Sequence, residues 1–264
     1  MIQTVTIENY KAIGKGRSIR LSDLSVFIGN NGSGKSSVFE ALQVLHRAVV
    51  ADLPDAFERW GGLEMVRHHG AAFAYPVRTK TDFVREYAPI ALKVTGRLNR
   101  KSYRYEVGFN TIKDEKYAVE YESLHVGNVE IFSARLLNDE GIAEARFKLS
   151  AEEAELQAIR ETDVLARPAT FRYEADQLFI SGLTFQAPPE CLAFRDYVAN
   201  WQFLTLNAHT MGFPATLNRF ATETRLDAEG RNIAEFVRNL AREPERLNAL
   251  VDRMKFVLPY ASDI

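Results

Sequence analysis

The pattern of apolar and polar residues near the start of the chain predicts a strand, a loop and a helix. Residues 24–29, "LSVFIG", form a short apolar run that is rich in β-forming residues and typical of a buried strand. A loop of glycine, asparagine and serine follows, and then "SSVFEALQVLHRAVV" (36–50) has the period of a helix. The apolar positions of that helical face are Val38, Leu42, Leu45 and Val49.

From residue 88 to about residue 149 the apolar period changes to two, which is typical of half-buried strands. Turn signals such as "TIKDEK" and "NDEG" separate the alternating runs, so we expect an antiparallel β-meander. Four tyrosines lie in it: Tyr103, Tyr105, Tyr117 and Tyr121. They are candidates for stacking on nucleic-acid bases, but tyrosines are ordinary on a half-exposed sheet, and we favour that structural interpretation.

The other segments have weaker patterns. Residues 51–88 contain the breakers "WGG" and "RHHG" and are expected to be irregular. Residues 150–264 are expected to be mainly helical, beginning with a helix over 151–161. Asp227 is expected to start a later helix. The apolar face of that helix comprises Ile233, Phe236, Val237 and Leu240.

Composition and charge narrow the function classes. The chain has 264 residues, of which 46% are hydrophobic and 26% charged, so it can bury a sizeable core. The net charge of −2 gives no global electrostatic reason to bind nucleic acid. Cys191 is the only cysteine, which excludes an internal disulfide and favours a reducing compartment. We find neither a membrane-spanning run nor a signal peptide and expect a cytoplasmic location.

The glycine-rich loop carries the most specific chemistry. Gly29, Gly34, Lys35 and Ser36 satisfy the pattern G-x-x-x-x-G-K-[ST] of a phosphate-binding loop (P-loop). Its glycines let successive N–H groups point at phosphate oxygens, the lysine contacts the β- and γ-phosphates, and the serine hydroxyl of Ser36 binds Mg²⁺. The predicted phosphate-binding residues are Gly29, Asn30, Asn31, Gly32, Ser33, Gly34, Lys35, Ser36 and Ser37. Because a strand and a helix are expected to flank the loop, we prefer this prediction to a plain surface turn and expect ATP and Mg²⁺ as cofactors.

Residues 6–45, "TIENYKAIGKGRSIRLSDLSVFIGNNGSGKSSVFEALQVL", resemble the opening of an ABC-type ATPase head of the RecF/SMC class. They are most similar to the AAA/OLD-like ATPases of bacterial genome-defence systems. Those proteins begin with a strand, an "NF+" turn (Asn9-Tyr10-Lys11 here), a second strand and "hhhGxNGSGKS". More loosely, "YAVEYESLHV" (117–126) and "LDAEGRNIAEFVRNL" (226–240) resemble later segments of the family.

The resemblance implies an α/β fold, namely a P-loop NTPase of the ABC/SMC-like head type with a mixed sheet, an antiparallel β-meander and helices. It divides the chain into a strand–P-loop–helix segment (1–50), a β subdomain (88–149) and a mainly helical segment (150–264). The family's signature serine and Walker B strand have no counterpart here. "NALVD" (248–252) has Arg253 where the catalytic glutamate belongs, and its apolar residues follow a helical period. We therefore expect an incomplete head that binds ATP but hydrolyses it little on its own.

Two further contacts are carried over from the resemblance. Related heads have an arginine beyond the P-loop helix that contacts nucleotide or a partner, and Arg67 is the candidate here. Gln186 is the candidate for the glutamine that contacts Mg²⁺ in such heads. A surface arginine and a loop glutamine are the respective alternatives.

Three classes of function stay open on the sequence. The first is an ATP-binding head that acts in DNA maintenance or anti-phage defence. It would form a homodimer or larger assembly through its heads, with DNA or an effector protein as a further partner. The second is a P-loop phosphotransferase or GTPase, which would need a Walker B strand and a lid or "NKxD". The third is a non-catalytic interaction module that uses nucleotide only to fold or to dimerise.

Overall fold

The computed structural model describes residues 1–16, 18–78, 84–147, 169–183, 187–211 and 225–257. The chain divides into two compact units, Met1–Trp201 and Gln202–Ile264. Each unit is described by itself. The helix predicted over residues 151–161 lies outside the described residues.

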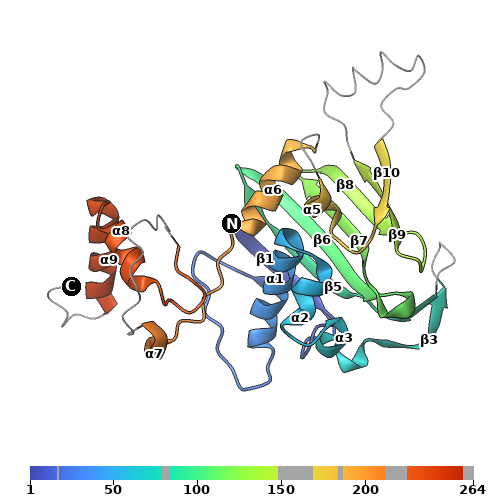
Figure 1. Ribbon diagram of the computed structural model, residues 1–264, viewed down its shortest axis with the longest axis horizontal. Helices are drawn as coiled ribbons and strands as arrows, with labels where there is room; N and C mark the ends of the chain where they lie inside the picture. Colours follow the sequence, from blue (N-terminus) through green and yellow to red (C-terminus); the bar gives the residue numbers. More distant parts are fainter. Residues whose placement is uncertain (17, 79–83, 148–168, 184–186, 212–224, 258–264) are drawn as a thin grey trace, which may run out of the picture. The chain divides into compact units, whose positions relative to one another are not determined.

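The first unit is built on an eight-stranded sheet in which every neighbouring pair is antiparallel. The strand order is β10-β9-β8-β7-β6-β5-β1-β2, so the predicted meander forms its centre (Figure 1). The strands are β1 (Ile2–Glu8), β2 (Ile19–Arg20), β5 (Ile90–Leu98), β6 (Lys101–Thr111), β7 (Tyr117–Val126), β8 (Val129–Leu136), β9 (Ile142–Phe147) and β10 (Ala169–Glu174).

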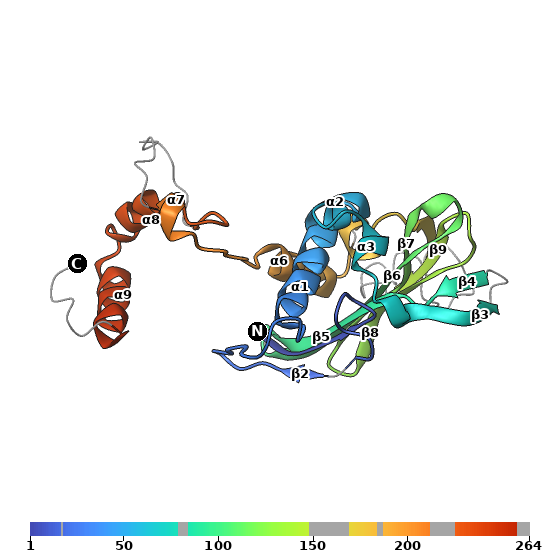
Figure 2. The same ribbon diagram turned by 90° about the horizontal axis from the view of Figure 1, so that it is seen from below.

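Helices cover one face of this sheet (Figure 2). The longest, α1, begins directly after the glycine-rich loop and contacts α2, α5 and α6. The helices of this unit are α1 (Lys35–Val50), α2 (Leu53–Glu58), α3 (Leu63–Val66), α5 (Phe179–Gly182) and α6 (Pro189–Ala199), with 3-10 turns η1 (His69–Ala71) and η2 (Lys113–Glu115).

The core lies between the helices and the covered face of the sheet. In β5 the residues alternate between buried and half-buried, with Ile90, Leu92 and Val94 facing the core. On α1 the predicted apolar face is buried, as Leu45 shows with no exposed surface. The inward side chains of the strands, which repeat every two residues, and those of α1, which repeat every 3.6 residues, therefore pack together in one apolar layer.

The opposite face of the sheet carries polar residues. Lys93 Nζ lies 2.9 Å from Glu106 Oε1, and Arg104 Nε lies 3.3 Å from the same oxygen. The Lys93–Glu106 pair crosses from β5 to β6, whereas Arg104 and Glu106 both belong to β6, and all three side chains are partly exposed. The sheet thus has one buried and one solvated face, as antiparallel sheets commonly do.

Two parts of this unit differ from the sequence-based expectation. Residues 51–88, expected to be irregular, form α2, α3 and a separate two-stranded sheet of β3 (Ala72–Arg78) and β4 (Val84–Tyr87). Asp52 caps α2 by accepting a hydrogen bond from the Asp55 N–H at 2.7 Å, so the start of this helix has a capping residue in the sequence. β10 lies within the segment expected to be mainly helical, because its six residues pair with β9.

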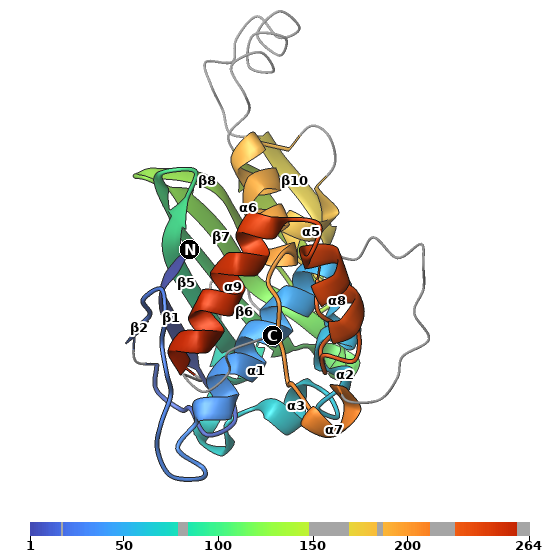
Figure 3. The ribbon, with the colours of Figure 1, turned by 90° about the vertical axis from the view of Figure 1, so that its left-hand side faces the viewer.

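The second unit contains short helices: α7 (Ala208–Met211), α8 (Ile233–Leu240) and α9 (Pro244–Val257). α8 and α9 contact each other (Figure 3). The expectation that Asp227 starts a helix is wrong, since α8 begins after Asn232. The Asp227 carboxylate instead accepts the N–H groups of Glu229 and Arg231, in the turn that precedes α8. Among the helices described in either unit, none has the length and apolar character needed to cross a membrane.

Candidate functional site

The glycine-rich loop between residues 29 and 34 has the backbone geometry that its sequence predicts. Gly32 and Gly34 adopt φ angles of 79° and 90°, in the left-handed region that glycine tolerates best. Asn30 to Ser33 are exposed. The loop therefore leads to α1 through an open turn that other residues would strain.

The Lys35 side chain folds back over this loop. Its Nζ donates to the carbonyl oxygens of Gly29 and Asn30, at 2.7 Å in both cases, and lies 3.4 Å from Ser33 Oγ. The loop thus surrounds an ammonium group with oxygen atoms. An ammonium group has three donors, and each has a loop oxygen within reach here, so a phosphate oxygen would replace one or more of these hydrogen bonds.

The start of α1 presents unpaired donors beside this lysine. In the described part of the chain, no hydrogen bond is recorded from the backbone N–H groups of residues 34–37. The first turn of α1 also has no acidic residue. Free N–H groups and the positive end of the helix dipole favour an anion, so this end of α1 suits phosphate.

The two serines after Lys35 differ in exposure. Ser36 is exposed and its hydroxyl is accessible to a Mg²⁺ ion, whereas Ser37 is buried, with 7% of its surface exposed. Ser36 is therefore suited to a phosphate–Mg²⁺ group. The buried Ser37 is less accessible to a ligand and fits a structural role beneath the loop.

A second turn, residues 9–14, packs against the loop. A Cβ atom added at Gly34 would lie 3.4 Å from Ile13 Cγ1. Lys11 Nζ pairs with Glu40 Oε2 of α1 at 2.6 Å, and His68 Nδ1 lies 2.7 Å from the Lys11 carbonyl oxygen. The "NF+" turn of the sequence thus holds the first half of α1 from the side.

The segment before the loop does not match its prediction. Residues 24–28 were expected to be a buried strand, but Leu24, Val26 and Ile28 are 81%, 75% and 91% exposed. Among the described residues no backbone ladder includes them. Phe27, on the other side, contacts Phe39 of α1 with ring centroids 5.2 Å apart. The segment has the apolar composition of a buried strand, yet in the described part of the chain no neighbouring strand covers it.

The guanidinium group of Arg67 is hydrogen-bonded within the protein. Its side chain is 4% exposed, and Nε and Nη2 donate to both carboxylate oxygens of Glu64 at 2.7 and 2.8 Å. It also donates to the Ala88 carbonyl and to Asn110 Oδ1. Partial burial acts to raise the pKa of Glu64, but the bonds from Arg67 and Thr111 outweigh it and lower that pKa. The geometry favours a structural role, because a nucleotide would have to compete with these partners. Contact of Arg67 with nucleotide stays a prediction.

The other predicted features have simple placements. Gln186 lies outside the described residues. "NALVD" lies within α9, so it is helical as its period predicted. Tyr103 and Tyr105 are buried in the core rather than displayed for stacking. In the described residues no group of three or more His, Cys, Asp or Glu side chains is arranged to hold a metal.

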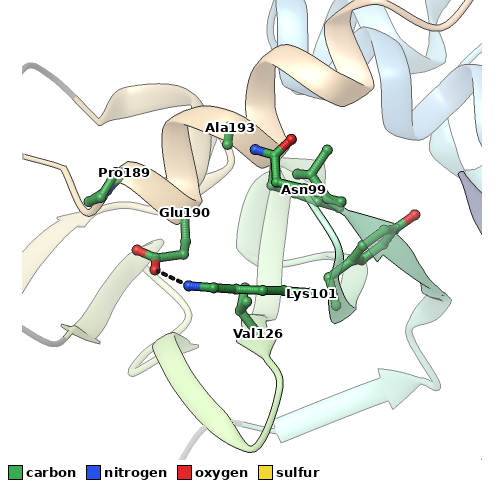
Figure 4. Close-up of a pocket in the computed structure, with 9 residues that line it drawn as sticks. Asn99, Lys101, Val126, Pro189, Glu190 and Ala193 are labelled. Carbon is green, nitrogen blue, oxygen red and sulfur yellow. Dashed lines mark ion pairs between the residues drawn. The ribbon is translucent and has the colours of Figure 1, made fainter.

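A small cavity of about 160 Å³ lies away from the loop, between the β5–β6 hairpin and α6 (Figure 4). Lys101 and Glu190 face each other beside it, with 3.6 Å between Nζ and Oε1. Because its charged groups already pair with each other, we assign it no role in the site.

Sequence reasoning missed a buried carboxylate in the sheet. Glu122 of β7 is 1% exposed. From the sequence, no role was assigned to this glutamate. The sequence did indicate this position: Glu122 lies two residues before Leu124, so both side chains point to the same face of β7, and Leu124 faces the core. A charged residue at an inward position of a strand requires partners.

Comparison with known proteins identifies the first part of the chain. The model of a protein family described as an AAA ATPase domain matches residues 1–160. Neither the search of curated proteins nor the search of solved structures found a match.

Proposed function

Because the chain belongs to the family of AAA ATPase domains, we propose that it binds ATP with Mg²⁺ at residues 29–37. The observation that carries the proposal is the arrangement at the start of α1. The Lys35 ammonium group lies over a loop of exposed backbone, next to the free N–H groups of the helix. In this arrangement Lys35 neutralises the β- and γ-phosphates, the loop amides bind their oxygens, and Ser36 completes part of the Mg²⁺ shell.

The finer proposal is that the chain is the ATP-binding part of a P-loop NTPase head of the RecF/SMC or OLD-like type. The sequence resemblance of residues 6–45 supports it. On the same basis we propose association of heads into a homodimer or larger assembly, with DNA or an effector protein as a further partner. DNA maintenance or anti-phage defence is the role that this resemblance favours.

Hydrolysis by such a head requires residues from elsewhere. Phosphoryl transfer needs a group that orients the attacking water. In the described residues the recorded partners of Lys35 are loop oxygens and include no carboxylate. The exposed side chains of Leu24, Val26 and Ile28 support this proposal, because a strand that leads into a P-loop is ordinarily covered. A further segment or partner would supply both the cover and the water-orienting group.

The test is binding and single-turnover hydrolysis of ATP and of GTP with Mg²⁺, in the wild type and in Lys35→Ala. We expect ATP to bind to the wild type without efficient turnover. Lys35→Ala should weaken binding by roughly 1.5–3 kcal/mol, as expected for a lost bond to a charged group, or about ten- to a hundredfold in Kd.

Lys101→Ala is the matched control, since it removes an exposed lysine remote from the loop. Equal binding by Lys35→Ala and the wild type would contradict the proposed site. Efficient wild-type turnover would show that a water-orienting group is present in this chain. A preference for GTP would favour the phosphotransferase or GTPase class.

A further inference from the structure

The buried carboxylate of Glu122 joins the central sheet to a short helix. Glu122 Oε1 accepts the Tyr105 hydroxyl at 2.9 Å and the Ile180 N–H at 3.2 Å, while Oε2 accepts the Phe179 N–H at 2.6 Å. The last two donors are the first two N–H groups of α5. One side chain of β7 thus holds the start of α5 against the sheet.

Only a carboxylate meets this demand. Three donors converge on the site, and a carboxylate offers two acceptor oxygens, whereas a glutamine would direct its NH₂ group at one of the donors. The surroundings are apolar and aromatic. Phe179 lies 5.1 Å from Phe132 between ring centroids, and Tyr105 stacks on Phe194 at 4.8 Å. Water is therefore excluded from the site, and each of these hydrogen bonds is costly to lose.

The next residue of α5 contacts the P-loop helix. Ser181 Oγ lies 3.1 Å from each of the carbonyl oxygens of Ala48 and Val49, in the last turn of α1. Those carbonyls have no partner inside the helix. α1 runs without interruption from Lys35 to Val50, a length of about 24 Å at 1.5 Å per residue. Ser181 and Lys35 therefore lie at opposite ends of one continuous helix.

We propose that Glu122 is a positioning residue for the nucleotide site, acting through α5 and Ser181 to fix the far end of α1. This inference rests on the proposed function, because it assigns regulation to the same loop. It adds that the ionisation of Glu122 changes nucleotide affinity near neutral pH.

Among the titratable groups that face one another at this site, the Glu122 carboxyl is the one that changes charge near neutral pH. Burial raises the pKa of the Glu122 carboxyl to about 7, although the hydrogen bonds from Tyr105, Phe179 and Ile180 act to lower it. The facing groups are Tyr105 of β6, Tyr173 of β10 and Cys191 of α6. Burial also raises the pKa of each of them, that of Cys191 to about 12, so they stay protonated. Protonation of Glu122 converts one acceptor into a donor and weakens its hold on α5.

Other contacts hold the same end of α1. His46 Nδ1 lies 2.9 Å from the Val198 carbonyl oxygen, and Arg47 Nη1 donates to the Asp55 carbonyl at 3.2 Å. Because these contacts persist when Ser181 is changed, Ser181→Ala is expected to fold. It removes the link between α5 and α1 and leaves the hydrogen bonds of Glu122 in place.

The first experiment measures the Kd of Mg²⁺–ATP between pH 6 and pH 8 in the wild type, Ser181→Ala and Glu122→Gln. We expect the wild type to lose affinity toward pH 6 by roughly fivefold, a coupling of ordinary size, beyond the change seen in Ser181→Ala. The terminal phosphate of ATP titrates in the same range, so the difference between the proteins is the result. Tyr105→Phe removes a hydrogen bond that lowers the pKa of Glu122 and should move the wild-type profile to higher pH.

The second experiment needs no nucleotide. Amide hydrogen exchange of residues 34–45 at pH 8 should be faster in Ser181→Ala and Glu122→Gln than in the wild type. Ser133→Ala is the matched control, because the Ser133 hydroxyl donates at the exposed surface to Glu130 Oε1, at 2.8 Å. Identical pH profiles and identical exchange in the wild type and Ser181→Ala would overturn the inference. Absence of ATP binding with altered exchange would instead refute the proposed function and leave Glu122 as a positioning residue of α1.

Discussion

β7 and the segment 24–28 both have sequences typical of strands, but among the described residues β7 has neighbouring strands and the segment has none. β7 pairs with β6 on one side and with β8 on the other, and its inward side chains are buried. Segment 24–28 has no recorded ladder among the described residues, and Ile28 is 91% exposed. The period of a sequence therefore indicates a strand, whereas burial depends on which other strands are present.

β7 and the start of α1 also differ in whether their polar groups have hydrogen-bond partners. On β7 the buried carboxylate of Glu122 accepts three hydrogen bonds, from Tyr105, Phe179 and Ile180. At the start of α1 the backbone N–H groups of residues 34–37 have no recorded partner in the described part. A paired and buried region provides stability, and an open region with free donors provides binding capacity. This contrast supports a nucleotide site at the loop.

The largest expected effect is in the sheet. Phe109 has no exposed surface and packs on Phe57 of α2, with ring centroids 5.6 Å apart. Phe109→Ala should lower the free energy of unfolding by about 3–5 kcal/mol, because it leaves a cavity in the core. Urea denaturation measures this. Phe171→Ala is the control, since that phenylalanine of β10 is 57% exposed and should cost much less. Equal losses in the two variants would contradict the placement of the core.

The second effect is a pH dependence of stability that originates in Glu122. The pKa is about 7 in the folded chain against 4.5 as the ordinary value. Between these values the folded state retains a proton that the unfolded state releases. The contribution is therefore fully present below about pH 4.5, falls as the pH rises, and is lost above about pH 7. Its upper limit is about 3 kcal/mol.

The measurement compares urea midpoints at pH 5 and pH 7.5 in the wild type and Glu122→Gln. The wild type should lose more stability than the variant, whose residue 122 does not titrate. A larger loss in the variant would show that the Glu122 pKa is not raised. Stability and ATP affinity should change in opposite directions with pH, since desolvation governs the former and the hold on α5 governs the latter.

Local patterns predicted the parts of the fold that depend on local rules. The meander was predicted because alternation and turn residues lie within a few positions of each other, as the left-handed φ angles of Asn99 and Arg100 in the β5–β6 turn illustrate. The P-loop glycines were predicted for the same reason. β10 was missed because its strand character comes from pairing with β9, across a long separation in sequence.

The parts of the site that were missed depend on tertiary contacts. Nothing local links Glu122 to α5, which lies 57 residues later in the chain. Likewise the sequence does not show that Glu64 and Asn110 bind the guanidinium group of Arg67, whose contact with nucleotide or a partner stays a prediction. A sequence pattern supplies a residue type at a position, and the fold decides whether its donors are free.

The smallest expected effect tests the comparison most directly. Val26 is 75% exposed and Val94 has no exposed surface, so the same change to serine separates the two environments. Val94→Ser should cost roughly 2 kcal/mol or more, because it buries a hydroxyl and removes apolar contacts. Val26→Ser should change the free energy of unfolding by less than about 0.5 kcal/mol and should reduce self-association in sedimentation experiments, since it breaks an exposed apolar row. A loss above about 1.5 kcal/mol for Val26→Ser would mean that the isolated chain already covers this segment. The proposed requirement for a further strand would then be wrong, while the phosphate-binding loop itself would be unaffected.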